Sequence, residues 1–313
     1  MLLPQETLEA GQGSVHVERA AAGRSSFRQL AFCYPLKLMP PRISASDAQL
    51  GTAVLCLYML TYGGGLVAGD TVDLEVKVDV ECHLVLLTQG NTKVFKDRPG
   101  GSYSGRKIES HPPGKALSAS SSPARTRQRM RVHIQPNASL FLLPAPVACF
   151  KDASYSQHQT FHLEDPSSSC LLLLDWFTSG RQSRGENWQF ERYRSRNEVI
   201  IAGRTIINDV LLLEGESYGK RMADFACYCN LFICGTALQA ISEHFKGLSQ
   251  DTTQYQRLFS EDLIWSYSEL EKDQAAVIRC AGVETETIKD WLAEQLKPLE
   301  MLIGRDIYKA AFV

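Results

Sequence analysis

Two acidic side chains beside glycine-containing turns are the residues of this sequence best suited to chemistry. Residues 61–70 read Thr-Tyr-Gly-Gly-Gly-Leu-Val-Ala-Gly-Asp and end on the carboxylate of Asp70. Residues 175–186 follow an apolar run and end on Glu186. A carboxylate held at the mouth of a turn can exchange a proton or offer a hard oxygen ligand to a metal ion.

The first turn carries four glycines, which allow backbone dihedrals closed to other residues or a close backbone approach. These are Gly63, Gly64, Gly65 and Gly69. Directly after the turn, apolar residues at every second position from 72 to 80 predict a half-buried strand. A phosphate-binding loop would need Gly-Lys-Ser/Thr opening a helix, and this turn opens a strand. A tight turn between strands, capped by Asp70, is the plainer interpretation.

Two further segments combine polar side chains with turn residues. In residues 175–186, Arg181, Arg184 and Glu186 surround two glycines, so an Arg–carboxylate pair could fix the loop, or the acid could stay free for a cation. Residues 88–93 carry Thr88, Gln89 and Lys93 after an apolar run. They predict either a ligand contact or a turn whose side chains form hydrogen bonds within the turn itself.

Evidence for a catalytic or tightly bound metal centre is weak. A hydrolase-type enzyme could use Asp70 and Glu186 as an acid–base pair, although nothing in the sequence places them within reach of each other. His158 and His162 share a strand face but would lie about 13 Å apart. Cys227 and Cys229 have no Cys-x-x-Cys partner to complete a site. No Gly-x-Ser-x-Gly or His-Glu-x-x-His motif occurs.

The composition is that of an ordinary globular protein, with 44% hydrophobic and 22% charged residues among 313. Nine scattered cysteines suggest free thiols in a reducing cytoplasm. The N-terminus lacks the basic and apolar regions of a signal peptide. The apolar stretch 225–241 is interrupted by polar residues, so it predicts a buried core segment and no membrane span.

Residues 98–131 carry eight basic residues against the single acid Glu109. Serine, proline and glycine fill most of the remainder, and such a stretch buries too little apolar surface to offset its chain entropy. Residues 98–127 are therefore predicted to be a disordered basic loop, with a nucleic-acid arm or a localisation signal as the alternatives. Removing the net +7 of residues 98–131 from the formal −2 leaves −9, which argues against a nucleic-acid-binding body.

Most of the chain predicts short strands, and helices are expected only in the last third. Apolar runs at 84–87, 171–174 and 210–213 suggest strands, the last two covered on both faces, and alternation at 132–135, 161–163 and 188–190 suggests half-buried ones. Residues 237–248 and 288–299 have helical composition or spacing. Pro298 should end or kink the second helix. The predicted fold class is mainly β.

Several blocks in fixed order resemble the urease accessory protein UreD (UreH) family. They are residues 34–38, 61–70, 88–96, 143–147, 150–157, 176–186 and 281–286. The resemblance covers nearly the whole chain except 98–127, which is absent from the usual pattern of the family. It implies one domain over residues 1–313, with a β-helix-like winding of many short strands and a few helices toward the C-terminus.

The resemblance also implies a non-catalytic scaffold that binds apo-urease together with UreF and the GTPase UreG, and that helps to deliver nickel. No cofactor would be tightly bound, and neither nucleic acid nor a membrane would be a partner. Carboxylates suit an ion in transit better than a Cys/His cage, which would hold nickel too tightly. Asp70 and Glu186 are the expected transient ligands, and Thr88, Gln89, Lys93, Arg181 and Arg184 the expected lining of the passage or of a partner surface. A passive docking scaffold without a metal role is the remaining alternative.

Overall fold

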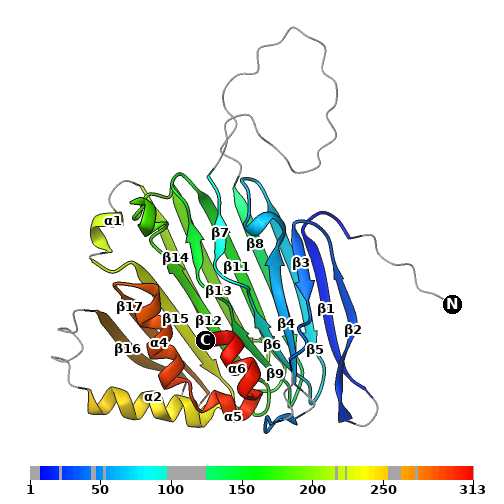
Figure 1. Cartoon of the computed structure of the whole chain (residues 1–313). Coiled ribbons are helices and arrows are strands. Elements are labelled where there is room, and N and C mark those ends of the chain that lie inside the picture. Colours follow the sequence, from blue (N-terminus) through cyan, green and yellow to red (C-terminus); the bar gives the residue numbers. More distant parts are fainter. Residues whose placement is uncertain are drawn as a thin grey trace, which may run out of the picture.

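Two β-sheets packed face to face form the body of the protein (Figure 1). The structure is a computed structural model, and it describes residues 8–20, 23–43, 47–51, 54–96, 125–215, 218–222, 224–252, 262–271 and 274–312. One sheet has seven strands and the other has ten. Helices are few and lie mostly near the C-terminus. The strand content confirms the mainly β class predicted from the sequence.

The seven-stranded sheet has the order β14-β13-β11-β8-β5-β1-β2. Its strands are β1 (Gln12–Arg19), β2 (Ser25–Phe32), β5 (Thr71–Val78), β8 (Thr126–Ile134), β11 (Ser154–Leu163), β13 (Arg192–Ile201) and β14 (Arg204–Glu214). The five strands from β1 to β13 are mutually parallel, and β2 and β14 pair antiparallel at the two edges.

The ten-stranded sheet has the order β16-β17-β15-β12-β9-β6-β4-β3, with two short strands beside β12. Its strands are β3 (Leu36–Met39), β4 (Val54–Thr61), β6 (His83–Leu87), β7 (Thr92–Val94), β9 (Ser139–Leu143), β10 (Val147–Cys149), β12 (Cys170–Thr178), β15 (Cys227–Cys234), β16 (Leu263–Glu271) and β17 (Ala275–Gly282). The strands β4, β6, β9 and β12 are mutually parallel.

Apart from the short β7 and β10, consecutive strands from β4 to β13 alternate between the two sheets. The connections that lead from the ten-stranded to the seven-stranded sheet therefore all lie at one end of the sandwich. The expected β-helix-like winding is not confirmed, because the strands form two mixed sheets with antiparallel pairs.

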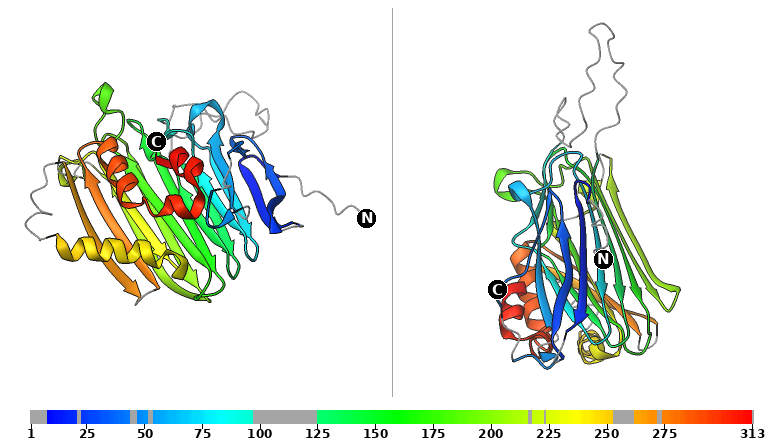
Figure 2. Two further views of the ribbon diagram at one scale, coloured as in Figure 1. Left: turned by 60° about the horizontal axis from the view of Figure 1, so that its bottom comes forward. Right: turned by 90° about the vertical axis from the view of Figure 1, so that its right-hand side faces the viewer.

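Helices cover the outer face of the ten-stranded sheet (Figure 2). They are α2 (Gln239–Asp251), α4 (Thr285–Gln295), α5 (Leu299–Ile303) and α6 (Arg305–Phe312), with the single turn α1 (Tyr218–Arg221) elsewhere. Their apolar faces join one core with the sheet, to which Phe245, Leu292 and Ile303 contribute fully buried side chains. Amphipathic helices gain most of their stability from such packing. Among the residues that the structure describes, no helix lies on the outer face of the seven-stranded sheet (Figure 2).

Several local predictions are confirmed. The strand after the glycine turn is β5, with inward residues buried and outward residues exposed or half-buried. Pro298 separates α4 from α5, as expected from its missing N–H. All nine cysteines are free thiols, and eight of them are buried. None of the helices in the described part of the chain is long and apolar enough to span a membrane.

Other local predictions are wrong. Trp188 and Phe190 do not lie in a strand; Trp188 has a φ of 55° in a connection. The run 210–213 is not covered on both faces, because β14 is an edge strand with Val210 and Leu212 exposed. The helix expected at 237–248 is present as α2, and only its end differs, because the helix continues through Gly247 to Asp251. Residues 126 and 127 of the predicted loop belong to β8, and residues 98–124 lie outside the described residues.

Candidate functional site

The polar turns singled out in the sequence meet at one end of the sandwich. The strands β4, β6, β9 and β12 end there, and β5, β8, β11 and β13 begin there. The connections contain residues 62–70, 88–91, 144–153 and 179–191. Because parallel strands place their ends at the same edge, blocks far apart in the sequence become neighbours at this end. We call it the connection end.

The glycine turn is shaped by close backbone contact with β7. It opens with the single helical turn η3 (Tyr62–Gly64), in which Gly63 and Gly64 have φ values of 75° and 77°. A Cβ on Gly65 would lie 2.7 Å from the carbonyl oxygen of Lys93 and 2.5 Å from the Phe95 ring. Any side chain at residue 65 would therefore push the two segments apart.

The Asp70 side chain is buried and closes its own turn. Its Oδ2 accepts a hydrogen bond from the backbone N–H of Val67 at 2.9 Å, and its own N–H donates to the Val67 carbonyl at 3.0 Å. The hydroxyl of Thr126 donates to the same carbonyl at 3.1 Å. Burial raises the pKa of Asp70, and the Val67 hydrogen bond opposes that rise. These contacts match the capping interpretation of Asp70.

Glu186 is engaged by an arginine. Arg181 donates to both carboxylate oxygens, with Nε 2.8 Å from Oε2, and the backbone N–H of Lys151 donates to Oε2 at 3.2 Å. The Arg181 guanidinium also lies over the Phe150 ring, 4.0 Å from its centre. Arg181 lowers the pKa of Glu186 below its usual range. This bidentate pair fixes the loop that contains η4 (Gln182–Arg184).

A groove of ≈ 590 Å³ runs between the glycine turn and the η4 loop. Five residues predicted from the sequence line it, and they are Gly63, Gly64, Lys93, Arg181 and Arg184. The rings of Phe95 and Phe150 contribute apolar surface and meet edge to face, with centres 5.0 Å apart. Neither Asp70 nor Glu186 is among the residues that line this groove.

Two smaller cavities lie beside the groove, and each shares lining residues with its neighbour. Gly64 and Asn91 line both the groove and a recess of ≈ 210 Å³, which is also lined by Thr88 and Gln89. The recess shares Thr88 and three other residues with an inner cavity of ≈ 20 Å³ between the sheets. That volume holds about one water molecule. Its wall includes the carboxylate-bearing residue Asp175.

Asp175 is the centre of a buried polar cluster, which we call the polar seam. Its carboxylate accepts hydrogen bonds from Gln157 Nε2 at 3.0 Å, Ser195 Oγ at 2.7 Å and Asn197 Nδ2 at 2.5 Å. The Tyr155 hydroxyl donates to Gln157 Oε1 at 3.2 Å. Burial raises the pKa of Asp175, and its three donors oppose that rise. A carboxylate inside a sandwich core is unusual unless such partners hold it.

Some polar atoms of the seam lack a partner among the residues that the structure describes. They are Gln159 Oε1, Asn197 Oδ1 and the Tyr193 hydroxyl. An unpaired buried polar atom costs about 1–3 kcal/mol, so this region suits water or another polar species. The sequence did not single out this cluster. Its signal is polar residues at every second position, 157 and 159 in β11 and 195 and 197 in β13, where inward apolar residues are expected.

The histidines and cysteines do not assemble into a metal centre in the described ranges. No group of three His, Cys, Asp or Glu side chains there is placed to hold a metal ion. His158 faces outward and lies 3.4 Å from Glu198, while His162 stacks on His133. Burial raises the pKa of the Cys227 thiol to about 12.

Comparison with known proteins identifies the family. The family model of the UreD urease accessory protein matches residues 9–310. Urease accessory protein 4 of Cryptococcus neoformans is 35% identical over 92% of this chain and 90% of its own length. Urease accessory protein D of Arabidopsis thaliana is 31% identical over 95% and 99%, and UreD of Sorangium cellulosum is 30% identical over 95% and 83%. The chain therefore belongs to the UreD family of urease accessory proteins, which confirms the resemblance noted in its sequence.

Proposed function

We propose that this protein is a non-catalytic scaffold of urease maturation that binds apo-urease together with UreF and UreG and helps to deliver nickel. The relatives it matches over most of their length are urease accessory proteins, which supports the maturation role. Nickel is the cargo, and no cofactor is tightly bound. The proposed site of action is the cytoplasm.

The polar seam is the observation that carries this proposal. Its central carboxylate, Asp175, lines the inner cavity, and that cavity, the recess and the open groove at the connection end share lining residues from one to the next. An ion in transit needs oxygen ligands that bind weakly enough to release it. Asp175, with the amide of Gln157 and the hydroxyl of Ser195, offers such ligands without a cage of thiolates or imidazoles.

Asp70 and Glu186 enter the proposal as two further transient carboxylates at the connection end. Each would have to exchange an existing hydrogen bond for the ion, with Val67 N–H in the first case and Arg181 in the second. The buried carboxylate of Asp175 lines a cavity, so it is the better candidate for the inner part of the route. Thr88 and Gln89 would line the entrance.

Partner docking is proposed at the same end. Lys93, Arg181 and Arg184 line the open groove, and the rings of Tyr34 and Tyr62, 58% and 43% exposed, lie 5.8 Å apart beside the glycine turn. Tyrosine and arginine are enriched in protein–protein interfaces and dominate their binding energy. A partner seated here would cover the entrance to the seam, so cargo could pass without entering bulk water.

The test is to purify the chain with apo-urease, UreF and UreG, in the presence and absence of nickel. Stoichiometric complex formation, followed by nickel-dependent urease activity, would support the proposal. If the complex activates urease equally well when the seam carries Asp175→Asn, a passive docking scaffold would be favoured. Turnover by the isolated chain that depends on Asp70 and Glu186 would favour the hydrolase alternative.

A further inference from the structure

The uncovered outer face of the seven-stranded sheet is rich in arginine. Outward positions of β8 and β13 carry three arginines each, and these are Arg127, Arg129, Arg131, Arg192, Arg194 and Arg196. No helix of the described ranges packs over this face of β8 and β13 (Figure 2). The corresponding face of the ten-stranded sheet is buried beneath helices.

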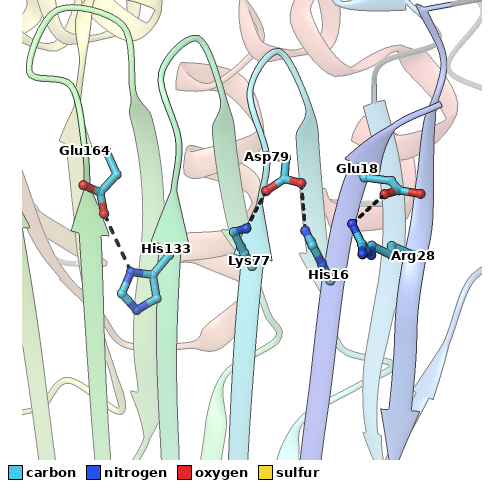
Figure 3. Close-up of polar contacts among 7 residues, drawn as sticks. All are labelled: His16, Glu18, Arg28, Lys77, Asp79, His133 and Glu164. Carbon is cyan, nitrogen blue, oxygen red and sulfur yellow. Dashed lines mark hydrogen bonds and ion pairs between the residues drawn. The ribbon is translucent and has the colours of Figure 1, made fainter. Parts of the chain in front are cut away.

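Charges at one end of this face are paired with opposite charges (Figure 3). His16 Nε2 lies 2.8 Å from Asp79, and Lys77 Nζ lies 3.1 Å from the same carboxylate. Glu18 meets Arg28 at 3.4 Å on the neighbouring strands. These contacts lie toward the carboxyl ends of β1 and β5, where the surface is close to electrically balanced.

The opposite end of the face, near the amino ends of β8 and β13, differs. Within the described part of the chain, no carboxylate pairs with Arg127 or Arg194. Ser156 of β11 is the register partner of both arginines, so the two guanidinium groups belong to one row across three strands. Two strand spacings place their Cα atoms about 10 Å apart.

The next row adds two more guanidinium groups, each of which is paired with one carboxylate. Arg129 lies 3.2 Å from Asp73, and Arg196 lies 3.2 Å from Glu198. His158 of β11 is the register partner of both of these arginines. Across the two rows, four arginines therefore face two acids, an excess of two positive charges.

Exposed apolar side chains border these rows. On the edge strand β14, Leu212 pairs in register with Arg194, and Val210 pairs with Arg196. Leu212 is 44% exposed and Val210 is 52% exposed. We call the group Arg127, Arg129, Arg194, Arg196, Val210 and Leu212 the basic patch.

We propose that the basic patch is a docking surface for an acidic, partly apolar protein surface carried by one partner of urease maturation. The excess charge selects an anionic partner, and the two apolar side chains gain from contact with a protein surface. A nucleic acid would satisfy the arginines but leave Val210 and Leu212 unmatched. The inference rests on the proposed function, because that function supplies the partners.

The experiment measures binding of the purified full chain to UreF, to UreG and to apo-urease separately, at several salt concentrations. The test variant is Arg127→Glu/Arg194→Glu. The matched control is Arg28→Glu/Lys77→Glu, which makes the same change in charge at the balanced end of the same face. Arg127→Gln/Arg194→Gln provides a milder test should the charge reversal disturb folding, which circular dichroism would reveal.

We expect the test variant to weaken binding of one partner by about tenfold or more and to reduce its salt dependence, with the control within about twofold. If the test variants bind all three partners as tightly as the wild-type chain does, the docking role of the basic patch is wrong, while the proposed function remains intact. A wild-type chain that binds none of the three would overturn both. If a single-stranded RNA probe loses affinity while protein binding is unchanged, the patch is a nucleic-acid site and the proposal is wrong.

Discussion

The ten-stranded sheet packs against two different layers, and the two contacts differ in chemistry. On its outer side, helices α2, α4, α5 and α6 meet it through apolar side chains and buried thiols. On its inner side, the core shared with the seven-stranded sheet is interrupted by Asp175 and its hydrogen-bonding partners. Buried polar clusters contribute little net stability compared with apolar packing. The helix-covered core is therefore explained by folding, and the polar seam is better explained by function.

The largest expected effect is on the helix-covered core. Phe245→Ala should lower the free energy of unfolding by about 3–5 kcal/mol, because it removes a fully buried ring and leaves a cavity. Met301→Ala is the control, since that side chain is 61% exposed and should change stability by less than about 0.5 kcal/mol. Denaturant unfolding checks both variants. A loss below about 1 kcal/mol for Phe245→Ala would show that this layer is not the stabilising one.

Asp175→Asn should lower the free energy of unfolding by about 1–3 kcal/mol, because Asn offers one acceptor oxygen to a site with three donors. The pH dependence has a definite sign. A raised pKa means that the folded state binds the proton more tightly, so the contribution of Asp175 to stability falls as pH rises from the usual Asp value through the raised one. The variant should lack this fall. If the free energy of unfolding depends on pH identically in the variant and in the wild-type chain, the raised pKa of Asp175 is contradicted.

Glu186→Gln should have a smaller effect on stability than Asp175→Asn, since it affects one loop at the surface. The lowered pKa of Glu186 means that its contribution is present above the usual Glu pKa and is lost as pH falls through the lowered value. The difference between variant and wild type should thus vanish in acid. Thermal unfolding at several pH values measures it, and a difference that persists at the acid end would rule out the ion pair as its cause.

Asp70→Asn should be the mildest of these changes for the fold. Asn Oδ1 can accept the same Val67 N–H, so the free energy of unfolding should change by less than about 0.5 kcal/mol. If Asp70 is a transient nickel ligand, the variant keeps its complex with UreF and urease but lowers nickel content and urease activity. If complex formation and activation fail together, Asp70 is structural only.

The sequence predicted the fold class because most strands alternate or form apolar runs, as β5 and β12 do. It did not predict β13, where Ser195 and Asn197 take inward positions that pattern analysis assigns to solvent. It misread residues 210–213, because an apolar run does not reveal that its strand lies at an edge.

The site was predictable only in part, for a similar reason. Glycines and arginines pointed to the turns at the connection end, and Lys93, Arg181 and Arg184 do line one groove. Asp70 accepts its side-chain hydrogen bond from Val67 within its own turn. The contact of Thr126 with the Val67 carbonyl and that of Lys151 with Glu186 join segments far apart in the sequence, so the sequence could not indicate them. In the polar seam, Asp175 of β12 accepts hydrogen bonds from side chains of β11 and β13. The spacing of residues within one segment cannot indicate contacts between three strands.

The central claim, that the polar seam serves nickel delivery, is tested most directly by the nickel content of urease matured with Asp175→Asn. The control is Leu173→Ala on the same face of the same strand, which should destabilise the chain by about 2–5 kcal/mol while keeping every hydrogen-bonding side chain of the seam. The account predicts that both variants form the complex with apo-urease, UreF and UreG, and that only Asp175→Asn lowers nickel per urease. Full nickel loading by Asp175→Asn, or equal loss in both variants, would contradict it.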